Sequence, residues 1–193
     1  MSLEVRPVRP TEYDRLGAVT VAAYLAVLGP QLSPRYRRAL SDVATRAAHA
    51  QILVVVDGSD LVGGVAYLDR PSRLTKFAGP GEAELRFLAV APWASGRGAG
   101  RALVDACLDQ ASATGKTLLG LFTFPRMAAA RALYLRLGFR RAPYRDWHVR
   151  PGLYLLSYVR DLGCTGGNTV DAAEKPGFSK MAGAGILAKE SPG

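Results

Sequence analysis

The sequence has few cysteines, few histidines and no long apolar run. Its 193 residues include two histidines and two cysteines, Cys107 and Cys164. Two cysteines make no disulfide framework, and their spacing matches no metal site, so we expect no bound metal and a reducing, cytoplasmic environment. No apolar run approaches ~18 residues, and no charged segment followed by an apolar core opens the chain. We therefore expect neither a membrane span nor a secretory signal.

Composition indicates one globular domain followed by a tail. Hydrophobic residues make up 49% of the chain and charged residues 21%, which is enough apolar material for one core. After about Leu162, glycine, alanine, lysine, serine and proline dominate. We predict a domain over residues 1–162 and a flexible tail over 163–193.

The formal net charge of +9 says little about binding partners, because the arginines are not clustered. Binding to DNA or RNA is typical of a basic stripe with interleaved aromatic residues. The arginines are instead scattered from Arg6 to Arg160. This distribution argues against a nucleic-acid partner and leaves a small local contribution from Arg97 and Arg101.

A strand, a glycine-rich turn and a helix follow one another between residues 84 and 114. Leu85, Phe87 and Ala89 alternate with Glu84, Arg86 and Leu88, and Val90 completes an apolar run. Pro92 ends the strand, and the helix begins after Gly96, Gly98 and Gly100. Free amides at a helix start, together with the helix dipole, form an anion site that suits phosphate. A dinucleotide fingerprint would need glycine where Arg101 stands, and a P-loop would need Gly-Lys-Ser/Thr at its end.

A second motif, later in the chain, helps to identify which phosphate-containing ligand the glycine-rich turn would bind. Residues 130–139 read Ala-Arg-Ala-Leu-Tyr-Leu-Arg-Leu-Gly-Phe, a helix with a glycine cap that leads into a strand. Together with Val-x-Pro-x-x-x-Gly-x-Gly-x-Gly-Arg-x-Leu at 90–103, this segment resembles the GNAT superfamily of acyl-CoA-dependent N-acetyltransferases. The resemblance covers roughly residues 3–160. It implies an α/β fold with a mixed, mostly antiparallel central sheet flanked by helices.

Local patterns predict elements in the same order. We expect an edge strand at 3–8, helices at 12–28 and 34–50, and a hairpin of strands 52–56 and 61–68. A loop at 70–82 leads to the central strand and its helix. A strand at 117–123, a helix at 127–137 and two strands at 139–142 and 153–159 follow, with a loop between the last two.

The resemblance implies a role for acetyl-CoA as co-substrate, without a metal. The pantetheine arm would pair with the backbone of Leu88, Ala89 and Val90, and the Val90 amide would polarise the thioester carbonyl. The pyrophosphate would bind the turn formed by Gly96, Arg97, Gly98, Ala99, Gly100 and Arg101. A primary amine would attack directly in a ternary complex, with no acyl-enzyme.

Two residues would handle the protons. Glu84 matches a carboxylate position of the family and is the expected base, unless it is only a strand charge paired with Arg86 or Arg101. Glu82 is the second choice. Tyr134 matches the tyrosine that protonates the leaving thiolate, unless it only packs the helix.

The acceptor pocket has no signature in the sequence. Tyr24, Tyr36, Tyr67 and His148 would line it or simply pack, and Ser95 and Met127 depart from the family pattern in ways that weaken coenzyme binding. A non-catalytic acyl-CoA sensor is the alternative to an enzyme. Homodimers are common among such proteins, and this sequence does not decide the point.

Overall fold

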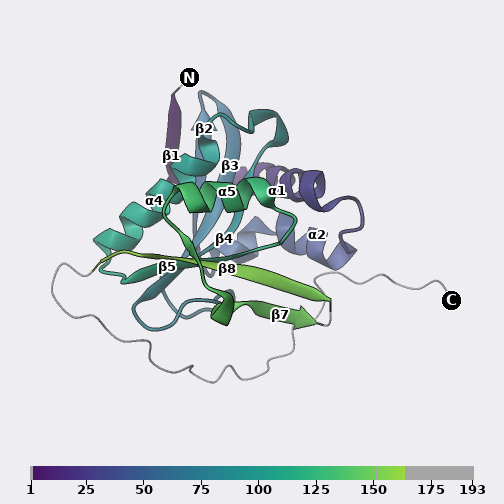
Figure 1. Cartoon of the computed structure of the whole chain (residues 1–193). Coiled ribbons are helices and arrows are strands. Elements are labelled where there is room, and N and C mark those ends of the chain that lie inside the picture. Colours follow the sequence, from purple (N-terminus) through teal and green to yellow (C-terminus); the bar gives the residue numbers. More distant parts are fainter. Residues whose placement is uncertain (1, 151, 164–193) are drawn as a thin grey trace.

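The computed structural model describes residues 2–150 and 152–163, and the structural statements below concern these residues. One sheet runs through the molecule, with helices on both of its faces (Figure 1). The strands are β1 (Leu3–Pro7), β2 (Gln51–Asp57), β3 (Asp60–Leu68), β4 (Glu82–Val90), β5 (Leu118–Thr123), β6 (Arg140–Arg141), β7 (Trp147–Arg150) and β8 (Leu153–Asp161). The α-helices are α1 (Tyr13–Leu28), α2 (Pro34–Ser41), α3 (Val43–Ala47), α4 (Ala99–Ala113) and α5 (Ala128–Arg136).

The sheet is mixed and mostly antiparallel, as predicted. Its order is β1-β2-β3-β4-β5-β8-β6, with β7 paired to β8. Only β4 and β5 run parallel, and their pairing extends from Glu82 opposite Leu118 to Leu85 opposite Leu121. Beyond that point β4 continues to Val90 and β5 to Thr123. The two central strands therefore diverge in the middle of the sheet.

A β-bulge lies where this divergence begins. The register of β3 with β4 shifts between Gly64 and Ala66, and Phe87 opposite has a φ of 54°, which is unusual for a residue with a side chain. As a result the consecutive side chains of Arg86 and Phe87 lie together, with the Arg86 guanidinium over the ring. The bulge thus re-aims side chains next to the open edge.

Each face of the sheet has its own apolar core. On one face, Leu103, Val104 and Cys107 of α4 pack with Leu85 of β4 and Tyr134 of α5. On the other face, α1, α2 and α3 cover the sheet, and helices of both sets are visible in Figure 1. No helix of the described residues is long and apolar enough to cross a bilayer.

Three predicted elements differ from the structure. The helix expected at 34–50 is divided into α2 and α3 at Asp42, whose carboxylate accepts a hydrogen bond from Thr45 N and starts a new helix. The strand expected at 139–142 shrinks to β6. The loop expected before residue 153 contains β7, because Trp147 pairs with Leu155. The predicted tail, apart from Gly163, lies outside the described residues.

Candidate active site

The divergence of β4 from β5 leaves an open backbone edge. Ala89 and Val90 pair with Gly64 and Gly63 of β3 on one side. On the other side, no described strand pairs with β4 beyond Leu85. Leu88, Ala89 and Val90 form this open edge, and those of their N–H and C=O groups that point away from β3 can bind the amides of an extended ligand.

The glycine-rich turn closes one end of the open edge. Gly96 and Gly98 have φ values of 80° and 88°, a left-handed conformation that favours glycine. Gly98 is the N-cap of α4, and its carbonyl accepts the first helical hydrogen bond, from Ala102 N. The amides of Ala99, Gly100 and Arg101 precede that bond and have no described partner.

Nothing else caps this helix. No side chain bonds to the first amides of α4, and its first turn contains no acidic residue. A Cβ added at Gly96 would meet no heavy atom within 4 Å, which leaves open space above the turn. Arg97 is exposed, whereas Arg101 Nε lies 3.2 Å from Asp105 Oδ2. The turn therefore fits a phosphate through its backbone more than through its arginines.

Tyr134 lies in the core between α5 and the sheet, on the α4 side. Its side chain is only 4% exposed and packs against the rings of Phe139 and Tyr158, at 5.8 and 6.2 Å between centroids. Burial raises the pKa of the phenol well above its usual value. Tyr24, from the other face of the sheet, is close enough to raise this pKa further. Tyr134 is therefore a buried, protonated hydroxyl on the α4 side of the sheet.

Glu84 lies on the opposite face of the sheet and is fully buried. Its Oε2 atom accepts hydrogen bonds from Lys76 N at 2.7 Å and Phe77 N at 2.8 Å. Its Oε1 atom has no hydrogen bond and lies 3.5 Å from Arg86 Nε. Burial raises the pKa of Glu84, although Arg86 and the backbone amides act in the opposite direction. One oxygen is thus held in place by two amides, and the other has no hydrogen bond and faces the Arg86 guanidinium.

The segment 74–79, which we call the strap, is fastened to β4 by alternate side chains. Arg86 donates to Leu74 O, Glu84 holds the amides of residues 76 and 77, and Glu82 accepts from Gly79 N. The Phe77 ring fills the space above a glycine of β5, because a Cβ added at Gly120 would lie 1.8 Å from it. The charged face of β4 therefore positions this loop.

Glu82, the alternative base, is already paired. Its two carboxylate oxygens receive hydrogen bonds from Arg145 at 2.7 and 2.8 Å. Burial alone would raise the pKa of Glu82, but the bonds from Arg145 and Gly79 lower it. A carboxylate held in this way is a poor proton acceptor.

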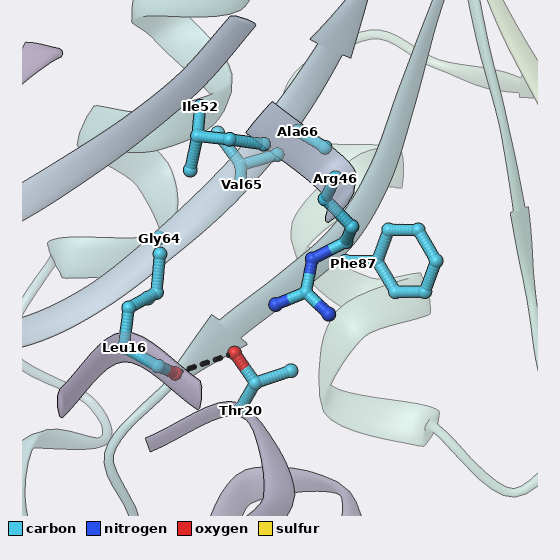
Figure 2. A pocket seen from close by; sticks show the side chains of 8 residues that line it. All are labelled: Leu16, Thr20, Arg46, Ile52, Gly64, Val65, Ala66 and Phe87. Atoms are coloured by element: carbon cyan, nitrogen blue, oxygen red, sulfur yellow. Dashed lines mark hydrogen bonds between the residues drawn. The ribbon is translucent and has the colours of Figure 1, made fainter. Parts of the chain in front are cut away.

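The cationic cluster around Phe87 was not predicted from the sequence. The guanidinium carbons of Arg46 and Arg86 lie 4.9 and 4.8 Å from the centre of its ring. Figure 2 shows Arg46 beside Phe87, above the Thr20 hydroxyl that donates to Leu16 O. Arg46 is 4% exposed, and its Nη1 donates to Ala39 O and Leu40 O at the end of α2. The sequence signal that could have indicated it is the spacing of Arg46, three residues after Val43, which places both on the same, buried side of α3.

Aromatic rings extend across the same face near the open edge. Tyr24 packs edge-on against Tyr36, and Tyr36 against Phe124, with centroids 6.2 and 6.4 Å apart. Phe122 contacts Trp147 at 5.8 Å. We call these five residues the aromatic wall. It joins α1 and α2 to β5, the segment after β5, and β7.

Other predicted residues lie elsewhere. Tyr67 packs on the α4 face with its hydroxyl 3.5 Å from Thr114 Oγ1, so it does not line the acceptor side. His148 is exposed and stacks on Tyr154. Met127 Sδ accepts a weak hydrogen bond from Thr123.

Burial raises the pKa of Cys107 to about 12, which makes it an inert thiol. The described residues include no group of three or more ligands suited to a metal.

Comparison with known proteins agrees with this geometry. A Staphylococcus aureus acetyltransferase of the GNAT family superposes with a TM-score of 0.67 at 14% identity, over 84% of this chain and 100% of that one. PaiA N-acetyltransferase from Thermoplasma acidophilum, in complex with coenzyme A, has a TM-score of 0.64 at 15% identity, over 83% and 99%. A Brucella melitensis GNAT acetyltransferase, in complex with acetyl-CoA, has 0.58 at 23%, over 84% and 90%.

These structures show a shared fold, and the family follows from the sequence. A comparison with curated protein sequences finds no match. The model of the acetyltransferase (GNAT) family matches residues 21–139, which is well over half of the chain. The match includes the open edge of β4, the glycine-rich turn and Tyr134. This protein therefore belongs to the acetyltransferase (GNAT) family and is an acyltransferase.

Proposed function

We propose that this chain transfers an acetyl group from acetyl-CoA to a primary amine, by direct attack in a ternary complex. The observation that carries the proposal is an open strand edge that ends at an uncapped helix N-terminus. The backbone of Leu88, Ala89 and Val90 would hold the pantetheine amides, and residues 96–101 the pyrophosphate. Acetyl-CoA, when bound, supplies an activated acyl group. The relatives from T. acidophilum and B. melitensis support this choice, since their structures contain coenzyme A and acetyl-CoA.

The protein's own groups would manage charge and protons. The Val90 N–H would stabilise the negative charge that develops on the thioester oxygen. As the C–N bond forms and the C–S bond breaks, Glu84 Oε1 would take the proton of the amine and Tyr134 would give one to the thiolate. Both side chains suit these roles, because burial keeps Tyr134 protonated and makes Glu84 more basic.

The proton acceptor and the proton donor would lie on opposite faces of the sheet. Glu84 lies on the α1 side and Tyr134 on the α4 side, and the divergence of β4 from β5 connects them. An amine that approaches from the α1 side would meet the thioester in this gap. The thiolate would then leave toward Tyr134.

The test combines calorimetry with thiol release from acetyl-CoA over a panel of amines. We expect coenzyme A to bind both the wild type and Tyr134→Phe, and turnover of the variant to fall on the order of 100-fold. Failure to bind coenzyme A would overturn the proposal. Binding without thiol release from any amine would instead support a non-catalytic acyl-CoA sensor.

A further inference from the structure

The acidic side chains on the α1 face already have partners. Glu82 is bound by Arg145, and Asp146 by Arg141 at 2.5 and 2.7 Å. Glu84 is held by the strap and lies 3.5 Å from Arg86. Each of these carboxylates already faces an arginine, and among them only Glu84 has an oxygen, Oε1, without a hydrogen bond.

Positive charge on the same face is not fully balanced. Among the described residues, no carboxylate forms a salt bridge with Arg46, although this guanidinium is almost completely buried, and Asp42 acts on its charge only from a longer distance. Its hydrogen bonds go to neutral carbonyls, so its charge remains. A buried charge is weakly screened and acts over a longer distance than one in water. Arg46 and Arg86, both close to the Phe87 ring, therefore bring two positive charges to this face, and one of them is opposite the Glu84 carboxylate.

These two positive charges lie close to the aromatic wall. Both arginines act to lower the pKa values of Tyr24 and Tyr36, although burial raises these values overall. Phe87, whose ring both guanidiniums contact, also packs against the apolar cluster that includes Tyr24 and Tyr36, so the arginines lie near the aromatic wall. Of the two arginines, Arg86 is the more accessible, with about a fifth of its side chain exposed.

We propose, on the basis of the function proposed above, that the acceptor is an amine with an apolar body and one carboxylate. The simplest such molecule is an apolar α-amino acid. The Arg86 guanidinium would bind the carboxylate, and the aromatic wall would pack against the apolar body. Arg86 is thus a specificity-determining residue, and the nearby positive charge of Arg46 would add to its attraction for the carboxylate.

The same charges favour the reactive form of the acceptor. An amine must lose its proton before it attacks, and nearby positive charge lowers the pKa of an ammonium group. A polyamine would bring several positive charges to a face whose carboxylates Glu82, Glu84 and Asp146 already face arginines, so it should bind poorly. The site therefore selects against polycations as well as for a carboxylate.

The test compares amines that differ by one group. Thiol release is measured with L-phenylalanine, L-phenylalaninamide and spermidine, for the wild type, Arg86→Gln and Arg86→Lys. We expect kcat/KM of the wild type to be at least tenfold higher for L-phenylalanine than for the amide, with spermidine lowest. In Arg86→Gln this ratio should fall to about one, and Arg86→Lys should restore part of it.

Arg15→Gln is the matched control for the loss of one positive charge. Arg15 is exposed and pairs with Asp60 beside the β2–β3 turn, and its variant should keep the wild-type preference. If spermidine or the amide is the better acceptor, this inference fails while the proposed function stands. If Arg86→Gln keeps the tenfold ratio, Arg86 is not the determinant. If no amine releases thiol, the proposed function itself fails.

Discussion

Replacing Glu84 by glutamine separates two roles that this carboxylate could have. In the structure its Oε2 atom holds the amides of Lys76 and Phe77, and its Oε1 atom carries no hydrogen bond. Glutamine keeps one oxygen for the strap but has no basic atom. We expect Glu84→Gln to bind coenzyme A normally and to lose about 100- to 10,000-fold in kcat, the usual contribution of a general base. This loss corresponds to about 3–5 kcal/mol in the activation barrier.

The pH dependence adds an independent readout. Burial raises the pKa of Glu84, so the wild type should lose kcat/KM as pH falls through a value above the usual range for glutamate. The base must be deprotonated, and therefore activity is retained on the alkaline side of that pKa. The residual activity of Glu84→Gln should lack this acid limb. Steady-state thiol release between pH 4.5 and 8 measures both profiles.

Glu84→Ala is the comparison for a purely structural role. Alanine leaves two buried amides of the strap without a partner, which costs about 1–3 kcal/mol for each group. We expect Glu84→Ala to be clearly less stable than wild type in urea denaturation, and Glu84→Gln to remain close to it. If Glu84→Gln keeps turnover within threefold of wild type while Glu84→Ala loses both stability and activity, Glu84 only anchors the strap. That outcome would refute the reasoning about the base.

Three further predictions test other parts of the structure. Gly98→Asp puts a negative charge at the start of α4, so calorimetry should show at least tenfold weaker binding of coenzyme A, whereas Gly115→Asp, at a left-handed glycine at the other end of the helix, should bind normally. Gly120→Ala would displace the Phe77 ring and should lower stability by about 1–3 kcal/mol in urea denaturation; an unchanged midpoint would contradict the fit of the strap. Bonds from Arg6 lower the pKa of Glu12 to about 2 against the usual 4.5, so this pair should add about 1 kcal/mol above pH 4.5 that is lost as pH falls toward 2. Acid denaturation of wild type and Glu12→Gln measures this difference, and a gap that persists at pH 2 would exclude the explanation.

Short-range patterns were sufficient for most of the elements. The glycines at 96, 98 and 100 predict a turn, and in the structure Gly96 and Gly98 adopt the left-handed conformation that such a turn needs. Ser33 and Pro34 mark the start of α2, where the Ser33 hydroxyl accepts a hydrogen bond from Tyr36 N. The prediction went wrong where a local signal depended on a partner. β7 exists because β8 pairs with it, and nothing within residues 147–150 alone requires a strand.

The sequence by itself determined the glycine-rich turn and the place of Glu84 and Tyr134 on their elements, because those features depend on neighbouring residues and on strand or helix periodicity. Only the tertiary structure decided what surrounds them. The pairing of Glu82 with Arg145 and the contact of Arg46 with the Phe87 ring join segments distant in the chain, and the strap folds back onto Glu84 from the preceding loop. Such contacts follow from the divergence of β4 and β5 and from the bulge at Phe87, which hydrophobic periodicity does not record.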